Sequence, residues 1–233
     1  STRKSSEKVL DIFKDFIPEL IGGSADLTPS NNTKVKSMSN ISSKNYSGDY
    51  IHYGIREHGM ASIMNGLSLH KGIIPYGGTF LVFSDYCRPS IRLSAMMGIK
   101  VIYVMTHDSI GLGEDGPTHQ PVEHLASLRA IPNLNVYRPC DINETFHAWV
   151  DAIRSNNPSL IALSRQDLRF INNFPQKLNQ KLLNIGAQVI YGSTKNQNIV
   201  LVSSGSEVEI AYSAAEELNK KGIKATVVSI SCS

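Results

Sequence analysis

The chain has 233 residues and a net charge of +3, from 23 basic and 20 acidic side chains, and 41% of its residues are hydrophobic. This ordinary composition predicts a globular protein with one large domain and part of a second. The basic residues are scattered, which argues against nucleic-acid binding, and the longest apolar runs are strand-sized, which argues against a membrane span. The first ten residues lack the apolar segment of a signal peptide, and three widely separated cysteines (Cys87, Cys140 and Cys232) suit a reducing compartment rather than disulfides or a zinc site. We therefore expect a cytoplasmic protein.

Helices and strands are expected to alternate over the first 164 residues. Apolar residues at helical spacing between Val9 and Ile17 predict an opening helix, which Ser5 or Ser6 could cap. Residues 34–48 are polar, as is typical of a surface loop. The other expected helices are 55–70, 81–97 (with Pro89 at a kink or in the first turn), 122–129 and 143–154 (with Asp141 as a cap), and the expected strands are 19–23, 73–76, 100–105, 134–137 and 159–164. This alternation predicts an α/β fold with a mainly parallel sheet flanked by helices.

The character of the sequence changes after Arg165. Residues 172–184 are polar and rich in Asn and Gln, which indicates a linker. Beyond them, one strand (199–203), one helix (207–221) and a second strand (225–230) are expected. A single unit of this kind cannot bury both faces of its sheet, so we expect a second α/β domain of which only part is present. The expected organisation is one domain over 1–171, a linker over 172–184 and a partial domain over 185–233.

The segment 106–120, THDSIGLGEDGPTHQ, has the most unusual composition in the chain. It follows the apolar run 101–104 and contains two histidines, three acids and three glycines. Loops at the ends of rigid strands often carry catalytic residues, which favours an enzyme. GLGEDG formally matches the dinucleotide fingerprint, but it does not directly join a strand to a helix, and Glu114 and Asp115 would repel the phosphates. A plain glycine-rich connection is the alternative.

His107 and His119 bracket this loop, each beside a polar residue. One loop histidine is usually just solvated, but two could converge on a small polar molecule. Neutral imidazoles hydrogen-bond sugar hydroxyls and transfer protons near neutral pH. A zinc site would need further ligands at suitable spacing, which the sequence does not offer.

Glu57 lies in YGIREHGM, near an expected helix start where the helix dipole favours an acid. A solvated acid is the simplest interpretation. However, the neighbouring Ile55, Met60 and Ile63 predict that this helix is buried. A buried carboxyl could share a proton with a heterocycle nitrogen.

Phe80, Phe83 and Tyr86 recur at positions i, i+3 and i+6. Spacing alone favours a core stripe over a ligand pocket. Flat rings can nevertheless hold a flat aromatic ligand, and Gly77 and Gly78 would let it approach closely.

Arg3, Ser30 and Arg165 could coordinate an anion. Arg165 directly follows an expected strand, at the carboxyl end where open α/β sheets bind ligands. For any single surface arginine, plain solvation is the alternative.

Five segments, taken in order, resemble the transketolases. They are GGSADLTPSN, YGIREHGM, PYGGTF with Phe83 and Tyr86 after it, THDSIGLGEDGPTHQP and ALSRQ. SSGSEVEI, residues 203–210, is similar to the start of the family's C-terminal domain. The resemblance implies the thiamine diphosphate-binding fold, with a pyrimidine-binding domain followed by part of the C-terminal domain. It also implies transfer of a two-carbon ketol unit from a ketose phosphate to an aldose phosphate, in the pentose phosphate pathway.

The resemblance also assigns roles to individual residues. The residues implied to contact the cofactor are Asp26, Leu27, Glu57, Phe80, Phe83 and Tyr86, and those implied to contact the sugar phosphate are Arg3, Ser30, His107, Asp115, His119 and Arg165. Glu57 and His107 are the implied catalytic residues. Glu57 matches the acid that hydrogen-bonds N1′ of the aminopyrimidine, which promotes the tautomer that deprotonates the thiazolium C2. Asp115 matches the acid that binds the C2 hydroxyl of the acceptor. The implied aromatic pocket reverses the preference for core that spacing gives to the ring stripe.

One part of the family pattern is missing from these residues. The GDG motif and following Asn that hold the diphosphate and Mg²⁺ or another divalent cation lie in the family's N-terminal domain. The family site also forms between two subunits. We therefore expect no metal ligands in this chain, a partnership with an N-terminal half in a homodimer, and no activity from the chain alone, whether it is a fragment or one subunit of a split enzyme.

Two other interpretations compete with transketolase. A relative in the same cofactor family, such as a dihydroxyacetone or deoxyxylulose phosphate synthase, is disfavoured by GEDGPTHQP and DLTPSN. A catalytically silent module that only dimerises would have no need for Glu57, His107 and His119.

Overall fold

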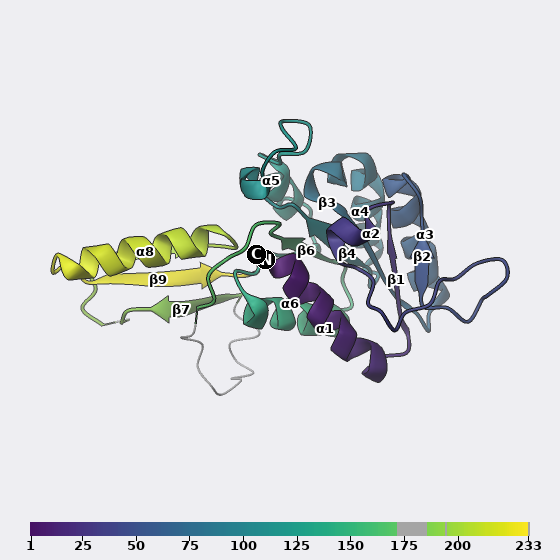
Figure 1. The fold of residues 1–233 in the computed structure, drawn as a ribbon, viewed down its shortest axis with the longest axis horizontal. Coiled ribbons are helices and arrows are strands. Elements are labelled where there is room, and N and C mark those ends of the chain that lie inside the picture. Colours follow the sequence, from purple (N-terminus) through teal and green to yellow (C-terminus); the bar gives the residue numbers. More distant parts are fainter. Residues whose placement is uncertain (172–185, 194, 233) are drawn as a thin grey trace.

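The computed structural model describes residues 1–171, 186–193 and 195–232, which form a large part and a smaller part beside it (Figure 1). The large part contains a six-stranded parallel sheet in the order β2-β1-β3-β4-β6-β5. The small part contains a mixed sheet in the order β7-β9-β8, with β9 parallel to β8 and antiparallel to β7. The predicted α/β class and the parallel sheet flanked by helices are confirmed.

The elements of the large part alternate along the chain. Its strands are β1 (Leu20–Ser24), β2 (Tyr50–His52), β3 (Ile74–Phe80), β4 (Ile102–Thr106), β5 (Asn135–Tyr137) and β6 (Ser159–Leu163). Its helices are α1 (Thr2–Phe16), α2 (Thr28–Asn31), α3 (Glu57–His70), α4 (Ser84–Met97), α5 (His124–Arg129) and α6 (Ile142–Arg154), with short 3-10 turns η1 (Leu81–Phe83) and η2 (Ile110–Leu112). The small part consists of β7 (Ala187–Tyr191), β8 (Ile199–Ser203), α8 (Glu207–Lys220) and β9 (Ala225–Ile230).

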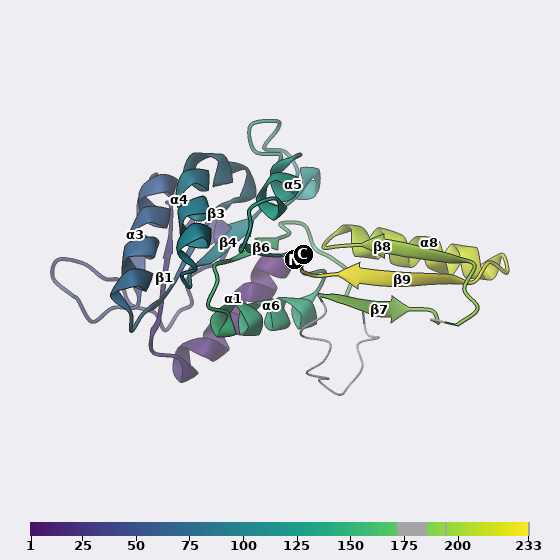
Figure 2. The same cartoon turned by 180° about the vertical axis from the view of Figure 1, so that it is seen from behind.

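Helices cover both faces of the large sheet, as the two opposite views show (Figures 1 and 2). Tyr103 and Met105 of β4 pack in a core cluster with α3 and α4, whereas Ile102 and Val104 pack in a second cluster with α1 and α6. Successive side chains of a strand point to opposite faces, so a strand buried on both sides is apolar throughout. This is why the apolar run within 100–105 predicted a strand.

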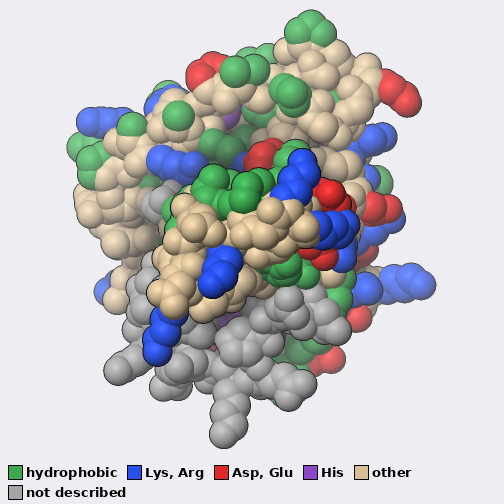
Figure 3. Space-filling model, turned by 90° about the vertical axis from the view of Figure 1, so that its left-hand side faces the viewer, with side chains coloured by type: hydrophobic (Ala, Val, Ile, Leu, Met, Phe, Trp, Pro, Cys, Tyr) green, Lys and Arg blue, Asp and Glu red, His purple; other side chains and the backbone are tan. Residues whose placement is uncertain are grey.

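The small sheet is packed against α8. Leu201 of β8 belongs to the cluster formed with Val208 and Ala215 of α8. Val200 and Val202, which alternate with Leu201, are 43% and 57% exposed. Figure 3 views this end of the molecule, where hydrophobic side chains reach the surface among charged ones. Within the described residues the sheet is therefore covered by a helix on one face, as a single strand-helix-strand unit predicts.

Several local predictions need correction. α1 begins at Thr2, so neither Ser5 nor Ser6 caps it; Ser6 instead accepts a hydrogen bond from Trp149 Nε1 at 2.8 Å. Pro89, which was expected at a kink or in the first turn of its helix, lies inside α4, so the first-turn alternative is wrong. The elements β2, α2 and β7 were not expected, and the expected linker over 172–184 lies outside the described residues.

One of the local predictions is confirmed. Asp141 caps α6, because its Oδ1 accepts a hydrogen bond from the backbone N–H of Glu144 at 3.0 Å. Across 1–171, 186–193 and 195–232, no helix combines the length and apolar character needed to cross a membrane.

The parallel register brings four strand ends to one edge of the sheet. Ser24 of β1 pairs with Gly78 of β3, near the carboxyl ends of both strands. Thr106 of β4 pairs with both Phe80 of β3 and Leu163 of β6. The segments that follow these strands therefore start side by side, at the edge where open α/β sheets bind ligands.

Candidate active site

The residues singled out from the sequence gather at this carboxyl edge. Asp26, Leu27 and Ser30 follow β1, Glu57 follows β2, Phe80, Phe83 and Tyr86 end or follow β3, His107, Asp115 and His119 follow β4, and Arg165 follows β6. Arg3 joins them from the first turn of α1, because the backbone N–H of Thr2 donates to Ser164 Oγ at 3.0 Å, just beyond the end of β6. Positions up to 162 residues apart in sequence thus meet at one edge.

Three stacked rings, which we call the aromatic ladder, form a flat surface at this edge. The ring centroids of Phe80 and Phe83 are 5.7 Å apart, and those of Phe83 and Tyr86 are 5.6 Å apart, with interplanar angles of 11° and 24°. Phe80 is buried at the end of β3, but Tyr86 on α4 is 64% exposed. Because the ladder runs from the core to the surface, it is not a simple core stripe.

Both histidines contact the aromatic ladder. The ring of His107 lies 3.7 Å from that of Phe80, centroid to centroid. The ring of His119 meets Phe83 edge-on at 5.3 Å. The convergence that the sequence suggested for the two histidines is therefore present, and it takes place against the rings.

His107 combines a buried side chain with an unusual backbone conformation. Its backbone has a φ of 61°, in the left-handed region that non-glycine residues rarely adopt, and its side chain is buried. Burial lowers the pKa of His107 to about 4; the positive charges of Arg3 and Arg165 act in the same direction, and Asp115 opposes them. The imidazole is therefore neutral at pH 7.

Asp115 and His119 sit on the loop after β4. A turn at Gly116, where φ is 76°, brings the chain back, and the backbone N–H of His119 donates to Gly116 O at 3.0 Å. His119 is half-buried, with its Nδ1 2.8 Å from Thr118 Oγ1, while Asp115 is exposed. The loop thus offers one acid and one imidazole to a molecule on the outer side of the aromatic ladder.

Glu57 is the first residue of α3, where the helix dipole favours a carboxylate. Its side chain is 8% exposed, and no described residue hydrogen-bonds to it. It lies near Cys87 on α4; burial first, and then the charge of Glu57, raise the pKa of that thiol to about 12. The predicted burial of Glu57 is therefore confirmed.

The reason given for that burial is partly wrong. Met60 is fully buried, but Ile55 and Ile63 are 80% and 50% exposed. α3 packs against the core through Met60, Ala61 and Met64 instead. Among the described residues, Ile55 and Ile63 do not belong to that core cluster.

Two arginines lie near each other at the remaining side of the site. Arg3 Nη1 donates to the carbonyl oxygen of Ser30 at 2.6 Å, and its buried Nε has no partner among the described residues. Burial, and then repulsion from Arg165, lower the pKa of Arg3. Arg165 lies against Gly113, where an added Cβ would be 3.1 Å from its Nη1. Two cations that repel each other, one with an unused donor, suit a bound anion.

Asp26 and Leu27 lie at the same edge but apart from these clusters. Asp26 is exposed with a φ of 63°, and the backbone N–H of Leu27 donates to Ser24 Oγ at 3.2 Å. Neither hydrogen-bonds the aromatic ladder within the part of the chain that the structure describes.

The sequence analysis missed a buried ion cluster next to His107. Arg138, directly after β5, donates from Nε to Asp108 Oδ2 at 2.8 Å and also pairs with Glu207 at the start of α8. Burial would raise the pKa of Glu207, but its ion pair with Arg138 outweighs that effect and lowers it. The cluster ties the loop after β4 to the small part of the chain. Its only advance sign was that Asp108 and Arg138 each follow a strand at the carboxyl edge.

A second missed cluster lies beside the aromatic ladder. His124 Nε2 is 3.1 Å from Asp85 Oδ2, and Glu123 is close to the other ring nitrogen. Asp85 and Glu123 are exposed, whereas His124 is buried. The hydrogen bond to Asp85 links α5 to the start of α4.

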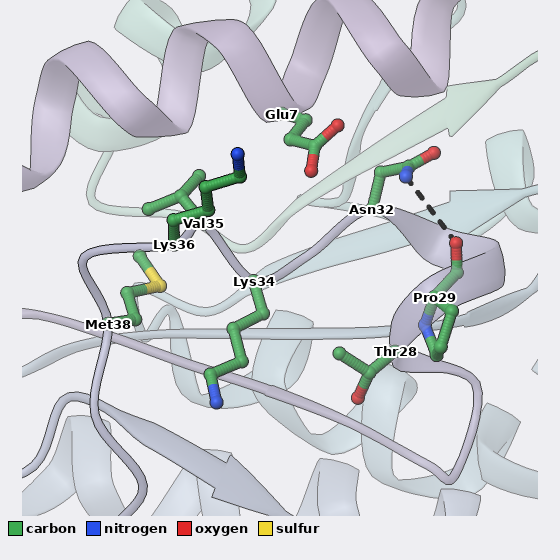
Figure 4. A pocket seen from close by; sticks show the side chains of 8 residues that line it. All are labelled: Glu7, Thr28, Pro29, Asn32, Lys34, Val35, Lys36 and Met38. Carbon is green, nitrogen blue, oxygen red and sulfur yellow. Dashed lines mark hydrogen bonds between the residues drawn. The ribbon is translucent and has the colours of Figure 1, made fainter.

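An open pocket lies elsewhere, between α1 and the segment that follows β1 (Figure 4). Its volume is about 300 Å³, and it is lined by Glu7, Thr28, Pro29, Asn32, Lys34, Val35, Lys36 and Met38. Figure 4 shows Glu7 and the amino group of Lys36 facing the same space, while Lys34 points away. None of the candidate cofactor or substrate residues lines it, although Thr28 and Pro29 of the motif GGSADLTPSN do, so the candidate site is the carboxyl edge rather than this pocket.

Fold and site together define a parallel α/β domain with a composite site at its carboxyl edge, made of a carboxylate, a flat aromatic surface, two imidazoles and two neighbouring arginines. The family model for the transketolase pyrimidine-binding domain matches residues 1–171, and that for the transketolase-like C-terminal domain matches residues 186–233. The chain therefore belongs to the transketolase family, as the ordered motifs predicted.

Individual relatives agree with this assignment. A transketolase of Sinorhizobium medicae is 56% identical over 234 residues, covering 100% of this chain and 33% of the relative. The structure of a Pichia stipitis transketolase in complex with sedoheptulose 7-phosphate has a TM-score of 0.94 and 45% identity, over 99% of this chain and 34% of that one. A split-gene transketolase, described as an inactive β4 tetramer, has a TM-score of 0.79 and 27% identity, over 99% of this chain and 71% of that one. The chain thus spans about a third of the length of the full transketolases it matches.

Proposed function

We propose that this chain supplies one side of the active site of a thiamine diphosphate-dependent transketolase, which transfers a two-carbon ketol unit from a ketose phosphate to an aldose phosphate. The observation that carries the proposal is the meeting of an uncommitted carboxylate, the aromatic ladder and a neutral His107 at one sheet edge. The sedoheptulose 7-phosphate complex of the Pichia stipitis relative supports a sugar phosphate as the substrate class.

The residues present fit the pyrimidine end of the cofactor. Glu57 has a carboxylate that no described residue engages, so it can accept or share a proton with a ring nitrogen. Phe80, Phe83 and Tyr86 offer the flat surface that an aromatic heterocycle needs. When bound, thiamine diphosphate supplies a nucleophilic carbon and an electron sink for cleaving the bond beside a ketose carbonyl. On this proposal Glu57 holds the proton at N1′, and the rings orient the pyrimidine.

The sugar would lie across the histidines. His107, kept neutral by burial and by Arg3, can hydrogen-bond a hydroxyl near the reacting carbons without a positive charge of its own. His119 approaches from the outer side of the aromatic ladder, and Asp115 can accept a hydrogen bond from the C2 hydroxyl of the acceptor. A site whose polar groups hydrogen-bond a substrate hydroxyl discriminates against analogues that lack it, because those groups are then left unpaired.

The phosphate would bind at the arginine side. Arg3 and Arg165 supply two guanidinium groups, and Ser30 lies beside Arg3. A guanidinium group can donate two parallel hydrogen bonds to the oxygens of one phosphate. This arrangement would set the phosphate near His107, because both arginines lower the pKa of that histidine.

The remaining parts of the site are proposed to come from other chains or segments. We assign residues 1–171 to the pyrimidine-binding domain, 172–184 to a linker and 185–233 to part of the C-terminal domain. The diphosphate and a divalent cation such as Mg²⁺ would be held by an N-terminal half, in a homodimer in the cytoplasm. The inactive state of the split-gene relative's β4 tetramer supports the expectation that this chain alone does not turn over substrate.

The test is to mix this chain with an N-terminal half of a transketolase, thiamine diphosphate and magnesium, and to assay ketol transfer. The mixture should be active, the chain alone should not, and Glu57→Ala in the mixture should lose nearly all turnover because the ring nitrogen loses its proton partner. Activity of the chain alone would refute the division of the site. Near-normal kcat of Glu57→Ala with cofactor bound would refute the role of Glu57.

A further inference from the structure

Arg138 stands at the junction between the large part and the small part of the chain. It directly follows β5, its backbone N–H donates to Ser231 O at 2.8 Å, and its carbonyl oxygen accepts from the backbone N–H of Gly205 at 3.0 Å. Ser231 directly follows β9, and Gly205 lies in the turn between β8 and α8. The main chain of Arg138 is therefore held by the segments that follow both parallel strands of the small sheet.

The guanidinium group of Arg138 joins an acid of the large part to an acid of the small part. Its Nε donates to Asp108 Oδ2 at 2.8 Å, in the loop after β4. Its Nη1 and Nη2 both pair with Glu207 at the start of α8, and Nη2 also donates to Ser206 Oγ at 3.1 Å. The turn before α8 lies close against this group, since a Cβ added at Gly205 would be 2.7 Å from Nε. A lysine, with one compact ammonium group, could not make both sets of contacts.

His107 lies between two residues that are fixed in different ways. On one side, Thr106 is the last residue of β4 and pairs with both neighbouring strands. On the other side, the buried side chain of Asp108 is held by Arg138. His107 itself has a φ of 61°, a left-handed conformation that a residue with a side chain keeps only where its surroundings impose it. The ion pair of Asp108 supplies the second of these two constraints.

We propose that Arg138 is a positioning residue, which fixes Asp108 and thereby the backbone of His107, so that the small part of the chain sets the geometry of the loop after β4. The effect runs from Glu207 on α8, through the guanidinium group, to the loop. Arg138 is not one of the candidate cofactor or substrate residues and acts on the site through His107. The inference rests on the proposed function for the statement that this loop binds the substrate.

The protonation of His107 reports its position. Burial is the main reason that its pKa is lowered to about 4, and Arg3 and Arg165 lower it further. If His107 is released from its place, water reaches the ring and the pKa rises toward its usual value of about 6.5. Loss of a nearby negative charge acts in the opposite direction, because it disfavours the imidazolium. A rise in this pKa after removal of Asp108 or Glu207 therefore indicates a change of position rather than of charge.

Nitrogen-15 NMR of the isotopically labelled chain measures the protonated fraction of His107, whose signals are those that disappear in His107→Gln. At about pH 5 the lowered pKa leaves about a tenth of the rings protonated. Asp108→Ala removes the partner of Arg138 Nε and should raise this fraction to at least about a third. The matched variant Asp108→Asn loses the same charge but keeps an oxygen that can accept from Nε, so it should not raise the fraction.

A second pair of variants tests the link to the small part. Glu207→Ala removes the acid that holds Nη1 and Nη2, and it should raise the protonated fraction of His107 at least about twofold. Glu216→Ala is the control on the same helix, because Glu216 pairs with Arg169 at 3.3 Å, and it should leave the fraction unchanged. The ring signals of His124, which is buried in α5, verify that each variant is folded.

An unchanged fraction in folded Asp108→Ala, or equal rises in Asp108→Ala and Asp108→Asn, would overturn the role of the ion pair. An unchanged fraction in Glu207→Ala would overturn the coupling to the small part. This second result does not depend on Asp108→Ala folding, because the Glu207 side chain is 47% exposed and its loss is tolerated more easily.

In the assembled enzyme, Glu207→Ala should raise KM for the ketose phosphate at least about threefold, while the concentration of thiamine diphosphate that gives half-maximal activity stays unchanged. A released His107 with an unchanged KM would refute the statement that the position of the loop governs substrate binding. The NMR measurement uses neither cofactor nor sugar. The ketol-transfer assay and the coupling through Arg138 can therefore fail independently of each other.

Discussion

Replacing Arg138 with Met should destabilise the chain far more than removing an exposed charge would. Arg138 is 6% exposed, and its partner Asp108 is 3% exposed. Asp108 Oδ1 already lacks a partner among the described residues, so without Arg138 the whole carboxylate would be sealed without a cation. Breaking a buried ion pair by removing one partner costs about 3–5 kcal/mol. The Glu207 side chain is 47% exposed, so its own pair with Arg138 adds less than about 1 kcal/mol.

Urea unfolding followed by circular dichroism and by fluorescence of the single, buried Trp149 measures this loss. For a chain of this size, about 3–5 kcal/mol corresponds to a fall in Tm of roughly 6–20 °C. Glu207→Gln is the control for loss of the exposed pair and should cost at most about 1 kcal/mol. Adding Asp108→Asn to Arg138→Met should recover part of the stability, because a neutral amide replaces the unpaired buried charge.

Two results would refute this reasoning. A loss below about 1 kcal/mol in Arg138→Met would place the pair among ordinary surface contacts. A double variant no more stable than the single one would show that the buried charge of Asp108 is not the source of the loss.

Two further predictions concern the loop after β4. In the assembled enzyme, Asp115→Ala should lower kcat/KM for acceptors with a C2 hydroxyl, because a charged hydrogen bond worth about 1.5–3 kcal/mol of transition-state stabilisation is lost. An equal loss for a 2-deoxy acceptor would contradict the role of Asp115. His107 has its pKa lowered to about 4 in the folded chain, so the unfolded chain binds more protons between about pH 6.5 and 4, and stability falls as the pH falls through that window. Relative to His107→Gln, the unmodified chain should therefore lose at most about 3 kcal/mol of unfolding free energy as the pH falls across this window. A difference between the two proteins that does not change with pH would rule out the lowered pKa.

The parallel α/β fold could be predicted because its causes are local. The run 101–105 is apolar at every position since β4 is covered on both faces, and Asp141 caps α6 through a residue only three positions away. The start of α1 could not be predicted in the same way. Thr2 is fixed by Ser164, 162 positions distant, rather than by a serine within its own first turns.

The candidate site could likewise be predicted only in part from the sequence. The ordered motifs indicated Glu57, His107 and the aromatic ladder, since their spacing carries the family pattern. They gave no sign of the buried hydrogen bonds that Thr106 makes with His107 and Asn31. The partners of His107 come from separate segments after β1 and at the end of β4, and Asn31 and Thr106 are common residue types whose role depends on contact.

The segment 106–120, an acid- and histidine-rich loop after a buried strand, indicated from the sequence alone that His107, Asp115 and His119 could bind and react. The tertiary structure decided how they can do so. Burial and nearby arginines make His107 neutral, ring contacts place both histidines against the aromatic ladder, and Arg138 pairs with Asp108 in the loop and with Glu207 in the small part. The sequence specifies which chemical group stands at each position. Protonation state, orientation and charge pairing depend on neighbours that only folding brings within a few ångströms, so the sequence alone could not specify them.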